Sequence, residues 1–319
     1  MNKLIAWLRI VRPPIILISC LGALVGALNV SAYLNNGTIQ LSLFQIFLII
    51  LGAASLAAGL MIHNDVTDLK SDKINRPSKP LPSGRITTKT ARLVGLLLMI
   101  LSIAIALFIN IKPDALFQLQ FKLFSLLNWR CGLLTFSIVF IGIYYNHYGK
   151  FHGIFGHTAV AYGVGAIPLW GAIAAAPNNI FLMIPLALAI FTQEIGREIM
   201  VNAGDFKGDL KAGYKTLPVL LGRKKAMYIA LLFYLAFIPL IPIPYFGWLG
   251  ADPVLFGSFY ITGAIIFSLS LLITWLLTYK EVRKNDEQRI WVAFERYERT
   301  GTRAIVLFFQ VMLLLEAFY

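Results

Sequence analysis

Long apolar runs follow one another along almost the whole chain, and this feature restricts its fold more than any other. A helix rises 1.5 Å per residue, so about 20 apolar residues cross the ~30 Å hydrocarbon core of a bilayer. The chain is 58% hydrophobic and 13% charged, whereas soluble domains carry about 25% charged residues. Most runs also lack the polar face of a helix in a soluble bundle. The sequence therefore predicts an all-α, polytopic membrane protein.

We expect nine membrane-spanning helices in a single domain, residues 1–319. The expected spans are 15–34, 40–62, 91–111, 131–147, 153–176, 179–199, 226–246, 254–278 and 302–318. The first run is too long for a signal peptide and lacks a convincing cleavage site, so we interpret it as a span.

The basic residues test the topology of these spans. With the N-terminus in the cytoplasm, 25 of the 28 Lys and Arg residues fall in cytoplasmic segments. The other three, Lys112, Lys122 and Arg130, share one outer loop. Cytoplasmic loops carry an excess of Lys and Arg, so we expect a cell-membrane protein with its N-terminus inside. The net charge of +13 then belongs to one membrane face and does not indicate a nucleic-acid partner.

Two acidic motifs with the same spacing follow the second and the sixth span. Residues at i, i+3 and i+7 share one face of a helix. Asp65, Asp68 and Asp72 have this spacing, and Asn202, Asp205 and Asp209 each lie 137 residues after their counterparts. The repetition indicates an internal pseudo-repeat, with halves of about 1–150 and 151–319.

Acids on one helix face repel one another unless a cation lies among them. Oxygen ligands without His or Cys favour Mg²⁺, which binds one or two carboxylates together with substrate phosphates. The motifs therefore predict a Mg²⁺ site that bridges to a diphosphate. Solvated surface acids explain most single Asp-x-x-x-Asp patterns, but duplication at two membrane edges favours a functional site. The candidate metal ligands are Asp65, Asp68, Asp72, Asp205 and Asp209.

Basic residues are interleaved with both motifs, and a diphosphate needs more positive charge than Mg²⁺ alone provides. Three prolines between residues 77 and 82 stiffen the loop after the first motif. The alternative explanation is ordinary positive-inside charge, which we accept for most of 280–303. The candidate diphosphate ligands are Lys73, Arg76, Lys79, Lys207 and Lys211.

Charged residues also precede the second motif, on the sixth span. Glu194, Arg197 and Glu198 lie on the face that continues to Asn202, and charges at this depth should face a cavity rather than lipid. Glu194 and Arg197 have the spacing of a helical ion pair. A structural pair and a role in acceptor binding therefore both stay open.

Tyr144 and Tyr145 lie near the end of the fourth span. Their ring faces could stabilise a carbocation. Tyrosines at a membrane interface are more often anchors.

The motifs and the segments after them resemble the signatures of the UbiA superfamily of intramembrane prenyltransferases. The first signature is Asn64–Asp72 followed by Asn75–Ile86, and the second is Asn202–Asp209 followed by Lys211–Pro218. The resemblance implies a central cavity capped by cytoplasmic motif loops. It implies that Asp68, Asp72, Asp205 and Asp209 hold Mg²⁺ and the diphosphate, and that Asn64 is the first-motif asparagine. Asn202 stands where the family often has Asp, which removes one possible acidic ligand.

The resemblance further implies transfer of a polyprenyl chain from its diphosphate to a lipophilic acceptor. Mg²⁺ and cations would stabilise charge on the departing diphosphate, while an apolar cavity would keep water from the carbocation-like chain. Glu194–Ile199 and Lys211–Pro218 resemble the archaeal lipid branch, whose donor is geranylgeranyl diphosphate and whose acceptor is geranylgeranylglyceryl phosphate. An aromatic acceptor of quinone or chlorophyll type is the alternative. Nothing in the sequence indicates an obligate protein partner.

A cation or proton transporter also uses intramembrane acids, but it places them near the bilayer midplane on broken helices. Here the acids cluster at one membrane face and are interleaved with lysines, which would repel a transported cation. The sequence favours an enzyme whose site faces the cytoplasm.

Overall fold

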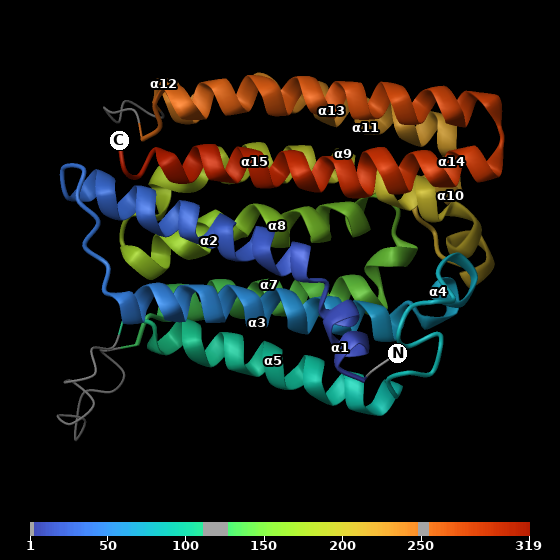
Figure 1. Ribbon diagram of the computed structural model, residues 1–319, viewed down its shortest axis with the longest axis horizontal. Helices are drawn as coiled ribbons and strands as arrows, with labels where there is room; N and C mark the ends of the chain where they lie inside the picture. The colour runs from blue at the N-terminus through green and yellow to red at the C-terminus, as the bar shows by residue number, and fades with distance from the viewer. Residues whose placement is uncertain (1–2, 111–126, 248–254) are drawn as a thin grey trace.

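The computed structural model describes residues 3–110, 127–247 and 255–319, and these segments contain helices and no strand. The long helices run side by side between the two ends of the molecule (Figure 1). They are α2 (Pro13–Leu34), α3 (Leu43–Thr67), α5 (Thr88–Phe108), α7 (Trp129–His147), α8 (Ile154–Ala175), α9 (Ile184–Ala212), α11 (Arg223–Phe237), α13 (Ser258–Lys284) and α15 (Thr302–Leu315). The all-α prediction is confirmed.

Six helices of the described chain are long and apolar enough to cross a membrane: α2, α3, α5, α8, α9 with the turn before it, and α13. The other three predicted spans correspond to α7, α11 and α15, which do not meet this criterion. The count of nine spans is therefore not confirmed, although these three helices lie within the same bundle (Figure 1).

Two boundaries differ from the prediction for clear reasons. The span expected at 226–246 stops at Phe237, and only a short α12 (Ile243–Phe246) follows. Three prolines in this stretch, Pro239, Pro242 and Pro244, cannot continue a regular helix. Conversely, α9 runs 13 residues beyond the expected end at 199, because the second acidic motif continues the helix.

Successive long helices pack as neighbours, and α15 returns to α2, which closes a ring. Across this ring α2 also packs against α8. A methyl group on Gly26 would lie 1.9 Å from the Pro168 carbonyl oxygen, and one on Gly171 would lie 1.9 Å from the Ala23 carbonyl oxygen. Glycine is what lets these two backbones approach so closely.

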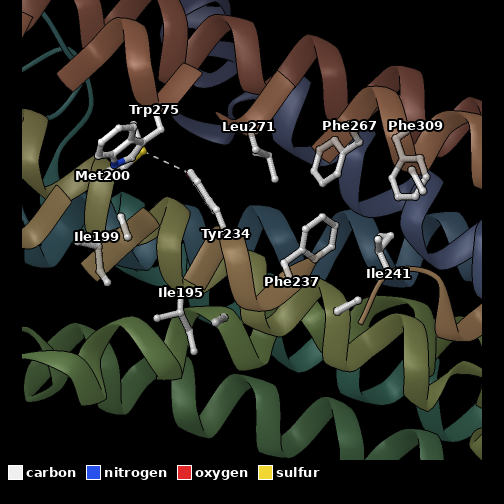
Figure 2. Packing of buried hydrophobic residues seen from close by; sticks show 14 of the residues in the cluster. Ile195, Ile199, Met200, Tyr234, Phe237, Ile241, Phe267, Leu271, Trp275 and Phe309 are labelled. Atoms are coloured by element: carbon white, nitrogen blue, oxygen red, sulfur yellow. Dashed lines mark hydrogen bonds between the residues drawn. The ribbon is translucent and has the colours of Figure 1, made fainter. Parts of the chain in front are cut away.

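Aromatic side chains hold α11, α13 and α15 together (Figure 2). Phe237 meets Phe267 edge to face at 5.7 Å between ring centroids, and Phe267 stacks on Phe309 at 5.2 Å. Tyr234 packs beside them and donates a hydrogen bond to the sulfur of Met200, 3.4 Å away. Each aromatic pair is worth about 0.5–1.5 kcal/mol beyond its buried area.

Short elements gather at the end of the bundle where the chain begins (Figure 1). They are α1 (Lys3–Val11), α4 (Leu69–Asn75), α10 (Leu217–Leu221) and α14 (Glu287–Ala293). A π-helical segment, η4 (Phe294–Gly301), connects α14 to α15. Both acidic motifs lie at this end; Lys112 and Lys122 of the predicted outer loop lie outside the described residues.

Candidate active site

A cavity of about 360 Å³ lies inside the ring of helices. Its mouth, at the end of the acidic motifs, is lined by charged side chains. The inner chamber is apolar and includes Leu186, Phe237, Phe267, Phe309 and Leu313. The charged lining residues of the mouth are Arg12, Asp68, Asp72, Arg76, Lys79, Lys150, Asp205, Asp209 and Arg299.

Both motifs are helical, as their spacing predicts, but the first is interrupted. α3 ends at Thr67 and α4 begins at Leu69; Asp68 between them has φ −82° and ψ 5°. The second motif lies entirely within α9. Gly213, directly after the helix, has a left-handed conformation (φ 79°) that glycine adopts without strain. Asp68, Asp72, Asp205 and Asp209 all line the same mouth.

Asp65 and Asp72 share one lysine. Lys79 Nζ lies 3.0 Å from Asp65 Oδ1 and 2.6 Å from Asp72 Oδ2, so the loop after the first motif folds back over it. Asp65 also pairs with Arg12, which a left-handed backbone (φ 54°) places between α1 and α2. Burial raises the pKa of the Asp72 carboxyl, more than the charge of Lys79 lowers it. Asp65 does not line the cavity, so its predicted role as a metal ligand is replaced by one of holding Arg12 and Lys79.

Asp205 is clamped by two arginines. Its Oδ1 accepts from Arg76 Nη2 and its Oδ2 from Arg299 Nη2, both at 2.7 Å. Arg76 comes from the first-motif loop and Arg299 from η4, so three separate elements meet at this carboxylate. Arg299 belongs to 280–303, where we attributed most of the charge to the positive-inside rule; Arg299 is an exception, because it pairs with Asp205.

Asp68 pairs with Lys150 and accepts a hydrogen bond from the Tyr214 hydroxyl at 3.2 Å. With its amide oriented to satisfy both ends, Asn64 donates to Asp68 Oδ2 at 3.0 Å and accepts from Lys150 Nζ at 3.2 Å. Burial, followed by the negative charge of Asp68, raises the pKa of the Tyr214 hydroxyl, so this group remains a donor. Asn64 therefore lies in the site, as the resemblance implies.

Asn75 ties the two motifs together. Its amide donates to the Asp205 carbonyl at 3.1 Å and to Ser71 Oγ at 3.2 Å, and it accepts from the Gly208 N–H at 3.0 Å. Ser71 in turn donates to Asp209 Oδ1 at 3.0 Å. This set of bonds fixes α4 against α9.

Four predicted residues are not brought to the mouth. Lys73 and Lys211 are exposed, and Lys207 is 58% exposed and lies 3.7 Å from Glu287. Tyr144 is exposed and packs against Tyr148, whereas Tyr145 lines the cavity with Lys150 5.3 Å above its ring centroid. The lysines follow motif acids by one or two positions, which on a helix turns them by about 100–200° to another face.

Arg197, Glu198 and Asn202 line the cavity below the mouth. The Arg197 guanidinium contacts Glu194 at 2.5 Å, Glu198 at 3.0 Å and Glu298 at 3.3 Å. Both the structural pair and the cavity position predicted for these residues are present. Because its charge is compensated three times, Arg197 is poorly suited to bind the phosphate of an acceptor.

The donor set fits a magnesium ion. Four carboxylates from two motifs face one cavity, and the oxygen ligands that Mg²⁺ prefers include neither Cys nor His. The described residues contain no preformed group of three or more such ligands, since the carboxylates pair with the cations around them. Mg²⁺ commonly uses one or two carboxylates and substrate phosphates, so a preformed cage is not required.

Sequence reasoning did not place Arg12, Lys150, Tyr214 or Arg299 at the diphosphate site. Their contacts with the motif acids cross 53, 82, 146 and 94 residues of chain, respectively. Of these four, only Tyr214 could have been connected with the site from the sequence, because it lies within the second signature segment.

A helical ring that spans a membrane and joins an acid-rich mouth to an apolar chamber defines a class of intramembrane proteins that accept a charged head and an apolar chain. The chain belongs to the UbiA prenyltransferase family, whose model matches residues 17–298. It is therefore a multi-pass membrane prenyltransferase.

Relatives and solved structures agree with this assignment. The chain is 32% identical to the digeranylgeranylglyceryl phosphate synthase of Thermococcus gammatolerans over 81% of this chain and 87% of that protein. It is 27% identical to that of Methanocaldococcus jannaschii over 91% of each. Its fold matches an apo UbiA homologue from Aeropyrum pernix (TM-score 0.69, 19% identity, 94% and 97% covered) and an Archaeoglobus fulgidus homologue bound to GPP and Mg²⁺ (TM-score 0.66, 18% identity, 98% and 99% covered).

Proposed function

We propose that this protein transfers a geranylgeranyl chain from its diphosphate to geranylgeranylglyceryl phosphate, with Mg²⁺ as cofactor, in ether-lipid synthesis. The choice of acceptor is supported by the relatives of 27–33% identity, which are named digeranylgeranylglyceryl phosphate synthases. The observation that carries the reaction type is the continuous cavity from acidic mouth to apolar chamber. A prenyl diphosphate has the same two parts.

The charges of the mouth support a requirement for a metal. The four carboxylates that line the mouth, with Asp65 behind them, are matched by five cations, Arg12, Arg76, Lys79, Lys150 and Arg299. A diphosphate that entered this neutral arrangement alone would leave its negative charge uncompensated. Held by Asp68, Asp72, Asp205 and Asp209, Mg²⁺ would supply the positive charge that stabilises the leaving diphosphate. Arg76, Lys79 and Lys150 would then be free to donate to phosphate oxygens.

The transfer exchanges one bond to carbon for another. The bond between C1 of the prenyl chain and the diphosphate oxygen breaks, and its electron pair leaves with the diphosphate. The hydroxyl oxygen of the acceptor bonds to C1 and loses its proton. The apolar chamber excludes water, which would otherwise capture the chain as an alcohol.

Purified protein offered both substrates and Mg²⁺ should form digeranylgeranylglyceryl phosphate, detected by mass spectrometry. EDTA should abolish the product, and Asp72→Asn or Asp209→Asn should lower kcat at least about 100-fold, as loss of transition-state charge stabilisation does. Full activity in EDTA would refute the metal. Prenylation of a hydroxybenzoate or naphthoate, with geranylgeranylglyceryl phosphate left unused, would refute the acceptor but not the enzyme class.

A further inference from the structure

A second polar level lies between the mouth and the apolar chamber, and the diphosphate chemistry described above does not use it. We call it the carboxylate cluster: Glu194, Glu198 and Glu298 around Arg197. Glu194, Arg197 and Glu198 line the cavity on α9, while Glu298 comes from η4. π-helical segments are rare and often occur at functional sites.

The three glutamates differ in what remains of their hydrogen-bonding capacity. Both oxygens of Glu194 are engaged by Arg197, at 2.8–2.9 Å from its Nε. Glu298 is fully buried and is not part of the cavity lining. Glu198 lines the cavity, and its contact with Arg197 uses Oε1 at 3.0 Å. Oε2 of Glu298 also has no partner among the described residues, but Glu298 does not line the cavity. Within the described chain, Oε2 of Glu198 is therefore the carboxylate oxygen of the cluster that is left for a ligand in the cavity.

Two glutamines that lie deeper in the cavity than Glu198, toward the apolar chamber, provide independent signs of a polar ligand. Gln193 lines the cavity and is 4% exposed, and its Nε2 has no hydrogen-bond partner among the described residues. On α15, Gln310 also lines the cavity; its Nε2 donates to the Ile18 carbonyl at 2.8 Å, and its Oε1 has no partner within the described chain. An unsatisfied buried polar group costs about 1–3 kcal/mol. A donor and an acceptor left open on two walls suit a hydroxylated ligand such as a glycerol group.

The position of Glu198 on α9 agrees with a role next to the reacting end of the prenyl chain. It precedes Asp205 by seven residues on one helix face, which is about 10 Å along the axis. A chain that extends from a diphosphate at Asp205 to Phe237 and Phe309 must pass this level. The charged or titratable groups around Glu198 are Arg197, Glu194, Glu298, Arg299, Tyr145 and Tyr234.

We infer that Glu198 takes the proton of the acceptor hydroxyl during prenyl transfer, an inference that rests on the proposed function. As the hydroxyl oxygen bonds to C1, its proton moves to Glu198 Oε2, and the electron pair of the broken C1–O bond leaves with the diphosphate. Arg197 holds the carboxylate in place through Oε1, and Gln193 and Gln310, deeper in the cavity, bind further polar atoms of the acceptor.

Glu198→Gln tests the inference because it keeps an oxygen for Arg197 but removes the base. We expect kcat to fall about 100-fold or more, as loss of a general base does, with little change in KM for either substrate. The wild-type rate should decline at low pH, where the base is protonated, and this decline should be absent from the residual rate of the variant. Glu198→Asp, which retains a carboxylate, should recover part of the rate.

Two controls separate a chemical role from a structural one. Geranylgeranyl diphosphate with Mg²⁺ should raise the Tm of Glu198→Gln as much as that of wild type, and Glu281→Gln, in a surface pair with Lys284, should be fully active. A kcat within about threefold of wild type, or loss of the Tm increase, would overturn the role of Glu198. Failure of the proposed function is distinguishable, because wild-type enzyme would then form no ether product.

Discussion

Lys150 is the most deeply buried cation of the mouth, with 4% of its side chain exposed. It pairs with Asp68 and lies 5.3 Å and 5.5 Å from the ring centroids of Tyr145 and Tyr214. Burying a charge is tolerable only when a partner compensates it, so removal of one partner costs more than removal of both.

Lys150→Met should therefore lower the free energy of unfolding by about 3 kcal/mol, because it leaves Asp68 without its counter-charge. In the double variant Lys150→Met/Asp68→Asn most of this loss should be recovered, since neither charge remains. Prenyl transfer should be lost in both variants. Thermal unfolding in detergent measures the stabilities, and a double variant as unstable as Lys150→Met would contradict the pairing.

At the scale of elements, the contact between α4 and α9 determines whether the two motifs face each other. A methyl group on Gly208 would lie 2.1 Å from Asn75 Nδ2, and three hydrogen bonds hold that amide in place. Gly208→Ala should displace it and lower the free energy of unfolding by about 2–4 kcal/mol, at about 1 kcal/mol per bond.

Activity should fall with it, because the motifs separate. Asn75→Ala serves as the matched control, because it removes the hydrogen bonds of Asn75 without a steric clash. In the Asn75→Ala background, Gly208→Ala should lower the free energy of unfolding little further. Full additivity of the two substitutions would contradict a direct contact between them.

A second element contact joins α11 to α14. Arg223 Nη1 lies 2.6 Å from Glu287 Oε1, and this hydrogen bond lowers the pKa of Glu287 below its usual 4.5. A depressed carboxyl pKa stabilises the fold above the unfolded-state pKa, and this contribution is lost as pH falls through the folded-state pKa.

Glu287→Gln should thus lower Tm slightly at pH 7. The loss in free energy of unfolding should be less than about 1 kcal/mol, because the pair is partly exposed. The difference from wild type should be lost at an acidic pH below the folded-state pKa, which lies under 4.5. Scanning fluorimetry at both pH values measures it; a difference independent of pH would assign the effect to something other than this ion pair.

For the whole molecule, the distribution of basic residues predicts that the mouth faces the cytoplasm. Lys73 and Lys207 are exposed at this end, whereas Ser71 is buried and Gly208 contacts Asn75. Cysteines at Lys73 and Lys207, in a Cys20→Ala/Cys131→Ala background, should react with an impermeant thiol reagent only in inside-out vesicles. A cysteine at Thr38, exposed at the opposite end, should react only in right-side-out vesicles. The reverse pattern would invert the topology.

The sequence by itself determined the membrane class, the helical motifs and the four aspartates that line the mouth. It could do so because bilayer thickness sets the length of apolar runs, and because i, i+3, i+7 spacing sets a helix face. Only the tertiary structure decided which cations meet the acids of the two motifs, Asp65 included. Lys73 and Lys207 are close to them in sequence but turn to other helix faces, whereas Arg12, Lys150 and Arg299 reach them from 53–94 residues away. Such pairs depend on how the ring of helices closes, which local spacing in the sequence does not determine.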